Sequence, residues 1–222
     1  MTEPASSVFS ASWPGLALLH ADAECVVVSK PSGIHSVPGL GSDKHDSLLT
    51  RLQAVDPLFH AVHRLDRDTS GVMVFGRTKA AVRALGMQFE ARTVHKRYVA
   101  LVAGLVADDA GEINLPMRYA PEIKPRQVVD AVNGKPATTH WQVLERRADT
   151  TLLALTPVTG RTHQLRVHCQ AMGHAIVGDS LYASEVWQCA RARLCLHASE
   201  LSFDHPSSGE RMRFVLPESF TS

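Results

Sequence analysis

Apolar residues fall into short runs at several places along the 222-residue chain. The β-branched run 26–28, followed at once by a Pro-Ser-Gly turn, predicts a strand and then a loop. The run 72–75 predicts a second strand, and 141–143 and 152–155 are expected to form a hairpin. Further strands are expected over 98–102, 194–203 and 212–216.

Helical spacing of apolar positions is limited to a few stretches. It predicts a short helix over 48–55, a longer one from Thr78 to about Arg92, and a third that begins near Thr162. The helices are few and do not alternate regularly with the strands. We therefore expect an α+β fold with a mixed, mainly antiparallel sheet rather than a doubly wound fold.

Composition narrows the class of protein. Hydrophobic residues make up 45% and charged residues 20% of the chain, which is typical of a globular protein and excludes disorder of the whole. No run of 18 apolar residues predicts a membrane span, and the polar segment 1–10 lacks the pattern of a signal peptide, so we expect a cytoplasmic protein. The four cysteines form no CxxC pair and no HExxH motif occurs, so no metal site is predicted.

Positive charge is concentrated in one segment, although the formal net charge is only +1. Residues 61–100 hold eight Lys/Arg against three Asp/Glu, a balance of +5. Such a run is often a solvated helix face, and it is also typical of a surface that contacts phosphates. Charge alone leaves both interpretations open.

Three polar segments are candidates for chemistry. His63–Gly71 holds two carboxylates, two arginines and two hydroxyls, more than a simple connector needs, although Asp68–Gly71 could be a turn that satisfies its own backbone. In Gly160–His168, helical spacing either presents Arg166 inward to a partner or forms a surface helix with a solvated basic side. Lys96–Ala100 places a tyrosine after two cations, which suits either a core-edge residue or a platform for stacking a base.

Together and in this order, the segments resemble the RluA family of RNA pseudouridine synthases. The similarity covers nearly the whole chain, and the pair HRLDxxTSG and GRTHQLRVH is highly specific. The segments that carry it are Lys30–Gly33, Val37–Gly39, His63–Gly71, Lys96–Tyr98, Gly134–Ala137, Gly160–His168, Leu196–Ala198 and His205–Glu210.

The resemblance implies an isomerase that converts specific uridines in structured RNA, ribosomal or transfer RNA or both, to pseudouridine. Asp66 matches the family's catalytic aspartate, Arg166 the arginine that pairs with it, and Tyr98 the base-stacking tyrosine. Arg64 matches an arginine that enters the space left by the flipped nucleotide. The substrate-binding positions implied in this way are Arg64, Leu165, His63 and Thr69.

The resemblance also implies a single catalytic domain over 19–220, with a sheet split by an active-site cleft, after an N-terminal extension over 1–18. No S4 RNA-binding domain is expected, and the protein is expected to act as a monomer. Because isomerisation changes no redox state and adds no group, no cofactor or metal is expected. Two alternatives are an RNA-binding or ribosome-assembly protein and an Asp-dependent N-glycosylase on the same fold.

Overall fold

The computed structural model describes residues 17–39 and 45–218. Most of the expected extension over 1–18, and part of the loop expected after the first predicted strand, therefore lie outside the described residues. The chain forms two compact units. Unit one comprises the described residues up to His95 together with Glu200–Leu216, and unit two comprises Lys96–Ser199 with the described residues after Leu216. Two strands, β5 (His95–Ala103) and β11 (Leu196–Asp204), contain residues of both units.

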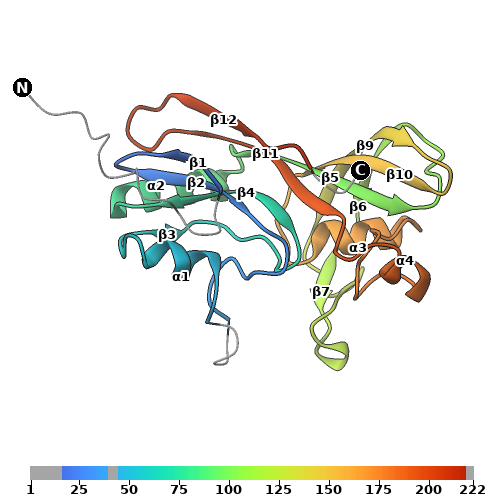
Figure 1. Cartoon of the computed structure of the whole chain (residues 1–222). Coiled ribbons are helices and arrows are strands. Elements are labelled where there is room, and N and C mark those ends of the chain that lie inside the picture. The colour runs from blue at the N-terminus through green and yellow to red at the C-terminus, as the bar shows by residue number, and fades with distance from the viewer. Residues whose placement is uncertain (1–16, 40–44, 219–222) are drawn as a thin grey trace, which may run out of the picture. The chain divides into compact units, whose positions relative to one another are not determined.

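Unit one is a set of antiparallel strands with two helices (Figure 1). β2 pairs with β1 on one side and with β4 on the other, β3 pairs with β4, and the end of β11 pairs with β12. The elements are β1 (Ala17–Ala21), β2 (Cys25–Lys30), α1 (Leu48–Gln53), β3 (His60–Ala61), β4 (Ser70–Gly76), α2 (Lys79–Ala91) and β12 (Arg211–Val215).

The core of unit one follows from the period of two in its strands. Alternate residues of β2 and β4 share one face, where they form an apolar cluster with Leu85 of α2 and Phe203 of β11. The Thr78 hydroxyl accepts a hydrogen bond from the Ala81 backbone N–H and so caps α2, and Arg92 ends the helix in the left-handed region with φ 60°. Both ends of this helix agree with the prediction from sequence.

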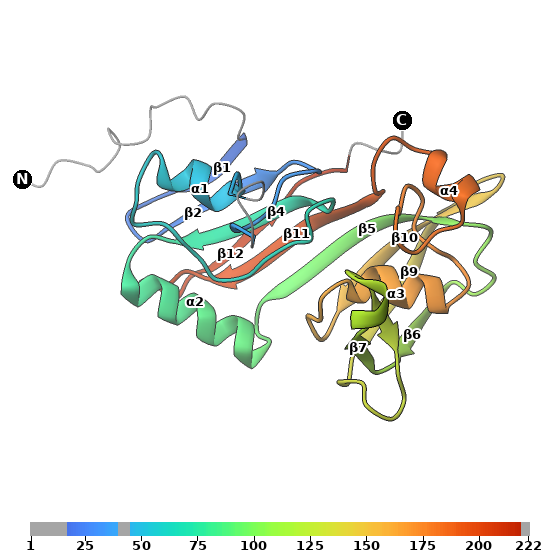
Figure 2. The ribbon, with the colours of Figure 1, turned by 90° about the horizontal axis from the view of Figure 1, so that it is seen from below.

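Unit two is built on a second antiparallel arrangement, in which the strands lie in the order β5, β10, β9, β6. A separate hairpin, which we call the β7–β8 hairpin, lies beside α3 (Figure 2). The remaining elements of this unit are β6 (Ala110–Asn114), β7 (Met117–Tyr119), the short 3-10 helix η3 (Pro121–Ile123), β8 (Gln127–Val129), β9 (Thr138–Arg146), β10 (Thr150–Pro157), α3 (Gln164–Ala171) and α4 (Glu185–Cys189).

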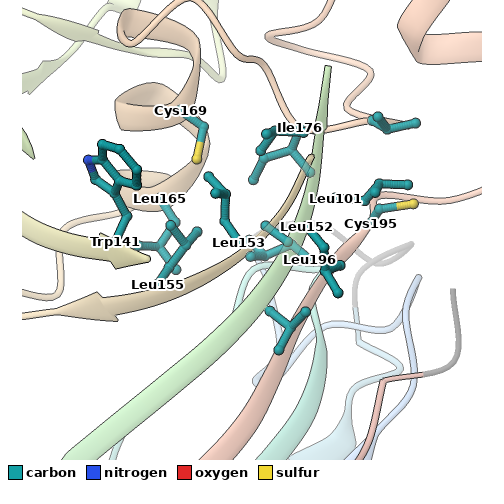
Figure 3. Packing of buried hydrophobic residues seen from close by; sticks show 14 of the residues in the cluster. Leu101, Trp141, Leu152, Leu153, Leu155, Leu165, Cys169, Ile176, Cys195 and Leu196 are labelled. Atoms are coloured by element: carbon teal, nitrogen blue, oxygen red, sulfur yellow. The ribbon is translucent and has the colours of Figure 1, made fainter. Parts of the chain in front are cut away.

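The core of unit two brings α3 against the strands. Figure 3 shows Leu165 and Cys169 of α3 facing a cluster that includes Leu153 and Leu155 of β10 and Trp141 of β9. The predicted hairpin of 141–143 and 152–155 is confirmed as part of β9 and β10.

The structure confirms the α+β class, because the strand ladders described above are antiparallel and only a few helices accompany them. The strands β1, β3, β6, β7 and β8 were not predicted from sequence. In the described residues no helix is both long enough and apolar enough to cross a membrane.

Candidate active site

The His63–Gly71 segment forms the end of the loop between β3 and β4 in unit one and the first two residues of β4, and Asp66 lies half-buried in the loop. The Thr69 backbone N–H donates to the Asp66 carbonyl oxygen at 3.2 Å, which closes a turn directly after the carboxylate. The Ser36 hydroxyl donates to the Leu65 carbonyl oxygen at 2.7 Å and accepts from the Leu65 N–H at 3.0 Å. The backbone on both sides of Asp66 is therefore held by hydrogen bonds.

Lys30, the last residue of β2, holds the same loop through hydrogen bonds from its side chain. Its side chain is fully buried, and its Nζ donates to the carbonyl oxygens of Pro31 at 2.9 Å, Arg67 at 2.8 Å and Thr69 at 2.7 Å. Burial lowers the pKa of Lys30 to about 8, against the opposing effect of Asp68 and Asp66, which raise it. A buried ammonium thus joins the Lys30–Gly33 turn to the loop that carries Asp66.

The other predicted residues of this loop have different surroundings. Arg64 is exposed. Thr69 is buried, and its carbonyl oxygen accepts a hydrogen bond from the Lys30 Nζ. The His63 Nε2 accepts a hydrogen bond from the Val74 backbone N–H at 3.1 Å, and its ring stacks on Phe89 of α2 at 4.5 Å between centroids. His63 therefore connects the loop to β4 and α2, and its role toward a substrate stays a prediction.

A pocket of about 570 Å³ lies in unit one next to the loop. It is lined by the turn 31–35 and by Asp46, Arg51 and Arg67. The Arg67 Nε donates to the Gly33 carbonyl oxygen at 3.1 Å, and Arg51 forms an ion pair with Asp46 at 2.7 Å. The lining includes several charged and polar side chains, and one of them, Arg67, directly follows Asp66 in the chain.

Arg166 is buried in unit two, with 3% of its surface exposed. Its Nε and Nη2 donate to the two carboxylate oxygens of Asp179 at 2.8 and 2.7 Å. The alternative of a surface helix with a solvated basic side is therefore wrong, because Arg166 and the other residues of α3 from Gln164 to Cys169 are buried, and only the last two residues of the helix are exposed. The expected pairing of Arg166 with Asp66 stays a prediction.

Tyr98 and Leu165 also belong to unit two. Tyr98 lies in β5 opposite Leu155 of β10 and is partly buried against the core cluster that contains Leu165. Leu165 itself is 7% exposed and packs in that cluster (Figure 3). Unit two thus holds an apolar wall, a tyrosine at its edge and a buried arginine.

Sequence reasoning missed Asp179 and Tyr182, which contact Arg166. The Tyr182 ring lies 5.0 Å from the Arg166 Cζ, and the Tyr182 hydroxyl lies 2.7 Å from the His163 Nδ1. The segment Gly178–Tyr182 holds a glycine, an aspartate and a serine before a leucine and a tyrosine, and this short run by itself predicts no role. No local signal links it to an arginine 13 residues earlier.

One further cluster, in unit one, has metal-ligating residue types. Ligand atoms of His20, Asp22 and Cys25 lie within 4.8 Å of one another. The Asp22 carboxylate accepts from the His20 Nε2 at 2.6 Å and from the His205 Nε2 at 3.0 Å, and burial raises the pKa of the Cys25 thiol to about 12. The His205 Nδ1 accepts from the Ser208 backbone N–H at 3.2 Å, so its Nε2 carries the proton that it donates to Asp22. Hydrogen bonds thus account for this cluster.

Comparison with known proteins places these residues in a family. Residues 24–171 match the sequence model of a family described as RNA pseudouridylate synthase. The chain is 45% identical over 208 residues to the dual-specificity RNA pseudouridine synthase RluA of Escherichia coli (strain K12), with 93% of this chain and 95% of that protein covered. The protein of the same name from Pasteurella multocida (strain Pm70) is 44% identical over the same shares. The chain belongs to the RluA family of RNA pseudouridine synthases.

Solved structures agree with this assignment. This pseudouridine synthase superposes on human RNA pseudouridylate synthase domain containing 1 with a TM-score of 0.78 at 29% identity, covering 98% of this chain and 86% of that one. The human protein named domain containing 4 gives a TM-score of 0.72 at 25% identity, covering 92% and 89%. The predictions of a pseudouridine synthase fold and of an isomerase that acts on RNA are confirmed.

Proposed function

We propose that this pseudouridine synthase isomerises uridines in structured ribosomal and transfer RNA, with Asp66 as its essential carboxylate. The observation that carries the proposal is the half-buried Asp66 in a loop whose backbone is held by Lys30 and Ser36. A carboxylate fixed in this way keeps one geometry relative to a bound nucleotide, which is what a positioned catalytic group requires.

The reaction breaks the N1–C1′ bond of uridine and joins C5 of the same base to C1′. The hydrogen on C5 leaves as a proton and N1 gains one, so the atoms balance without an oxidant, a reductant or a second substrate. Asp66 acts either by attacking C1′ or by removing a proton from the sugar. Both routes need an ionised carboxylate, and an arginine beside it favours that form. We assign this pairing to Arg166.

The remaining predicted residues are proposed to bind the substrate. A target base must leave its stack, which costs a few kcal/mol. Arg64, exposed in the same loop as Asp66, fills the space left in the RNA, and the ring of Tyr98 stacks on the base against the apolar wall at Leu165. Thr69 and His63 are proposed to support substrate binding by holding the loop, since the Thr69 carbonyl oxygen accepts from the Lys30 Nζ and the His63 Nε2 accepts from the Val74 backbone N–H.

Two kinds of RNA are proposed as substrates because relatives that share about 45% of their residues with this chain are named dual-specificity enzymes. The proposed setting is the cytoplasm, and the proposed functional form is a monomer with one catalytic domain over 19–220. Sedimentation of the protein alone and with transfer RNA tests the monomer: a dimer in either sample contradicts it.

The test of the catalytic assignment is Asp66→Asn with Asp68→Asn as its matched control. The two residues lie in the same turn. The Asp68 side chain is 38% exposed, and its Oδ1 lies 3.9 Å from the Nε of the neighbouring Arg67. Release of tritium from RNA that contains C5-tritiated uridine reports isomerisation, since C5 must lose its hydrogen. We expect no measurable release by Asp66→Asn and retained turnover by Asp68→Asn, with both variants folded. Parent-like turnover by Asp66→Asn refutes the assignment.

A further inference from the structure

We propose that Asp179 and Tyr182 are positioning residues for the isomerisation, which act by fixing the guanidinium of Arg166 in one orientation. The inference rests on the proposed function, in which Arg166 serves the reaction. It concerns residues that lie outside the segments by which the family was recognised from sequence. All three residues belong to unit two.

Asp179 holds Arg166 through a two-point contact. The carboxylate is fully buried, and its two oxygens accept from the Arg166 Nε and Nη2 at 2.8 and 2.7 Å. Paired N–H donors facing paired oxygens fix the plane of the guanidinium as well as its distance. Because an arginine carries five N–H groups, those on Nη1 stay outside this two-point contact.

The backbone around Asp179 is itself held in place. Asp179 Oδ1 also accepts from the backbone N–H groups of Leu181 at 2.9 Å and Tyr182 at 3.1 Å. The preceding Gly178 has φ +77°, and a Cβ there would lie 1.9 Å from the Arg193 carbonyl oxygen. A left-handed backbone that only glycine fits thus sets the position of the carboxylate.

Tyr182 covers the guanidinium and ties it to its surroundings. Its ring lies 5.0 Å from the Arg166 Cζ, a cation–π contact, and packs with Met117 of β7 and Val167 of α3. Its hydroxyl accepts from the Gln127 backbone N–H at 2.8 Å and lies 2.7 Å from the His163 Nδ1. One side chain therefore contacts the arginine, the start of α3 and the β7–β8 hairpin.

This arrangement exceeds what packing of a helix requires. A buried ion pair often stabilises a folded protein no more than apolar residues of the same volume do. Removing one partner strongly destabilises the protein, because the other charge is then buried without compensation. What the pair does provide is a charged guanidinium whose position and orientation are fixed before the substrate binds. A charge of that kind stabilises a developing reaction centre without rearrangement.

The first test is Asp179→Asn, with Asp130→Asn as a matched control. Asp130 has the same pattern of contacts at another place in unit two: its Oδ2 accepts from the Arg118 Nε at 2.7 Å, and its Oδ1 accepts from the backbone N–H groups of Val132 and Asn133. The assay is tritium release from total RNA that contains C5-tritiated uridine, prepared from cells that lack this enzyme. Rates are divided by the folded fraction measured by circular dichroism.

We expect Asp179→Asn to lower kcat on the order of 100-fold with little change in KM, because a small misplacement of a catalytic group has an effect of this size. Asp130→Asn should keep the parent kcat. A parent-like kcat per folded molecule in Asp179→Asn overturns the inference, since its role would then be structural only.

The second test uses the Tyr182 side chain and remains decisive where Asp179→Asn does not fold. Tyr182→Leu removes the ring that covers the guanidinium, whereas Tyr182→Phe keeps the ring and removes only the hydroxyl. We expect kcat to fall in the leucine variant and to be largely recovered in the phenylalanine variant. Equal kcat in the leucine variant and the parent contradicts the role of the ring.

A double variant separates this inference from the proposed function. Where Asp179 acts through Arg166, Arg166→Gln combined with Asp179→Asn has the kcat of Arg166→Gln alone. Losses that multiply in the double variant overturn that route of action. An active Arg166→Gln refutes the proposed role of Arg166 itself, whereas an inactive Arg166→Gln beside a fully active Asp179→Asn refutes only the inference.

Discussion

Replacing Lys30 by methionine removes the buried ammonium under the Asp66 loop and keeps most of the volume of the side chain. The carbonyl oxygens of Pro31, Arg67 and Thr69 then lose the donor that they share. The Arg67 oxygen retains a hydrogen bond from the Gly33 backbone N–H at 3.0 Å. A buried polar group that loses its partner destabilises the folded protein by about 1–3 kcal/mol. Part of this loss is offset, because burying methionine does not require removing a charged group from water.

The pH dependence of the free energy of unfolding gives a more specific value for the contribution of Lys30. Burial lowers the pKa of Lys30 from 10.5 to about 8 in the folded protein. Between these values the unfolded chain binds more protons than the folded one, so the contribution of Lys30 to stability rises with pH. With 1.36 kcal/mol for each pH unit, the gain from pH 7 to pH 9.5 is about 2 kcal/mol.

The assay is urea unfolding of the parent and of Lys30→Met at pH 7 and pH 9.5. The free energy of unfolding of the parent, relative to that of the variant, should increase by about 2 kcal/mol at the higher pH. Subtracting the variant removes the effects of other groups that titrate in the same interval. A difference that is the same at both pH values refutes the lowered pKa and the burial that causes it.

Two further predictions concern stability away from Asp66. The pKa of Asp22 is about 2 against 3.8 unfolded, because its hydrogen bonds outweigh the effect of burial. Asp22→Asn should therefore lower the free energy of unfolding by about 2 kcal/mol at pH 7, and urea titrations should show this difference vanishing as the pH falls through about 2. Gly178→Ala should lower the melting temperature far more than Gly173→Ala. Both glycines have positive φ, but a Cβ at Gly173 meets nothing within 4 Å and one at Gly178 meets the Arg193 carbonyl oxygen at 1.9 Å. Equal melting temperatures in the two variants contradict the close contact.

Local structure was predictable from the sequence where the residues that determine an element lie within one short segment. The Thr78 hydroxyl caps α2 through a backbone N–H three residues later, and the helix ends at Arg92 as expected. The hairpin of β9 and β10 follows from two apolar runs separated by a short polar turn. Strands without such runs, such as β7, were missed because the residues that cover them are distant in the chain.

The sequence by itself also determined the family and the candidate residues. The segments around Asp66 and Arg166 are specific enough that the class of enzyme followed from them before any fold was known. Their type and order carry this information because the chemistry needs a carboxylate, a cation and an aromatic ring, whatever the surrounding scaffold.

Only the tertiary structure decided what surrounds these residues. The period of α3 assigned Arg166 to a face of the helix, but a period does not determine whether that face meets water or protein. Tyr182 and Asp179 cover it, and their contact with Arg166 depends on the fold of the segment after α3. Lys30 is likewise an ordinary cation before a turn in the sequence and a buried ammonium on three carbonyl oxygens in the structure. Burial and long-range hydrogen bonds arise from packing between distant segments, which local pattern does not contain.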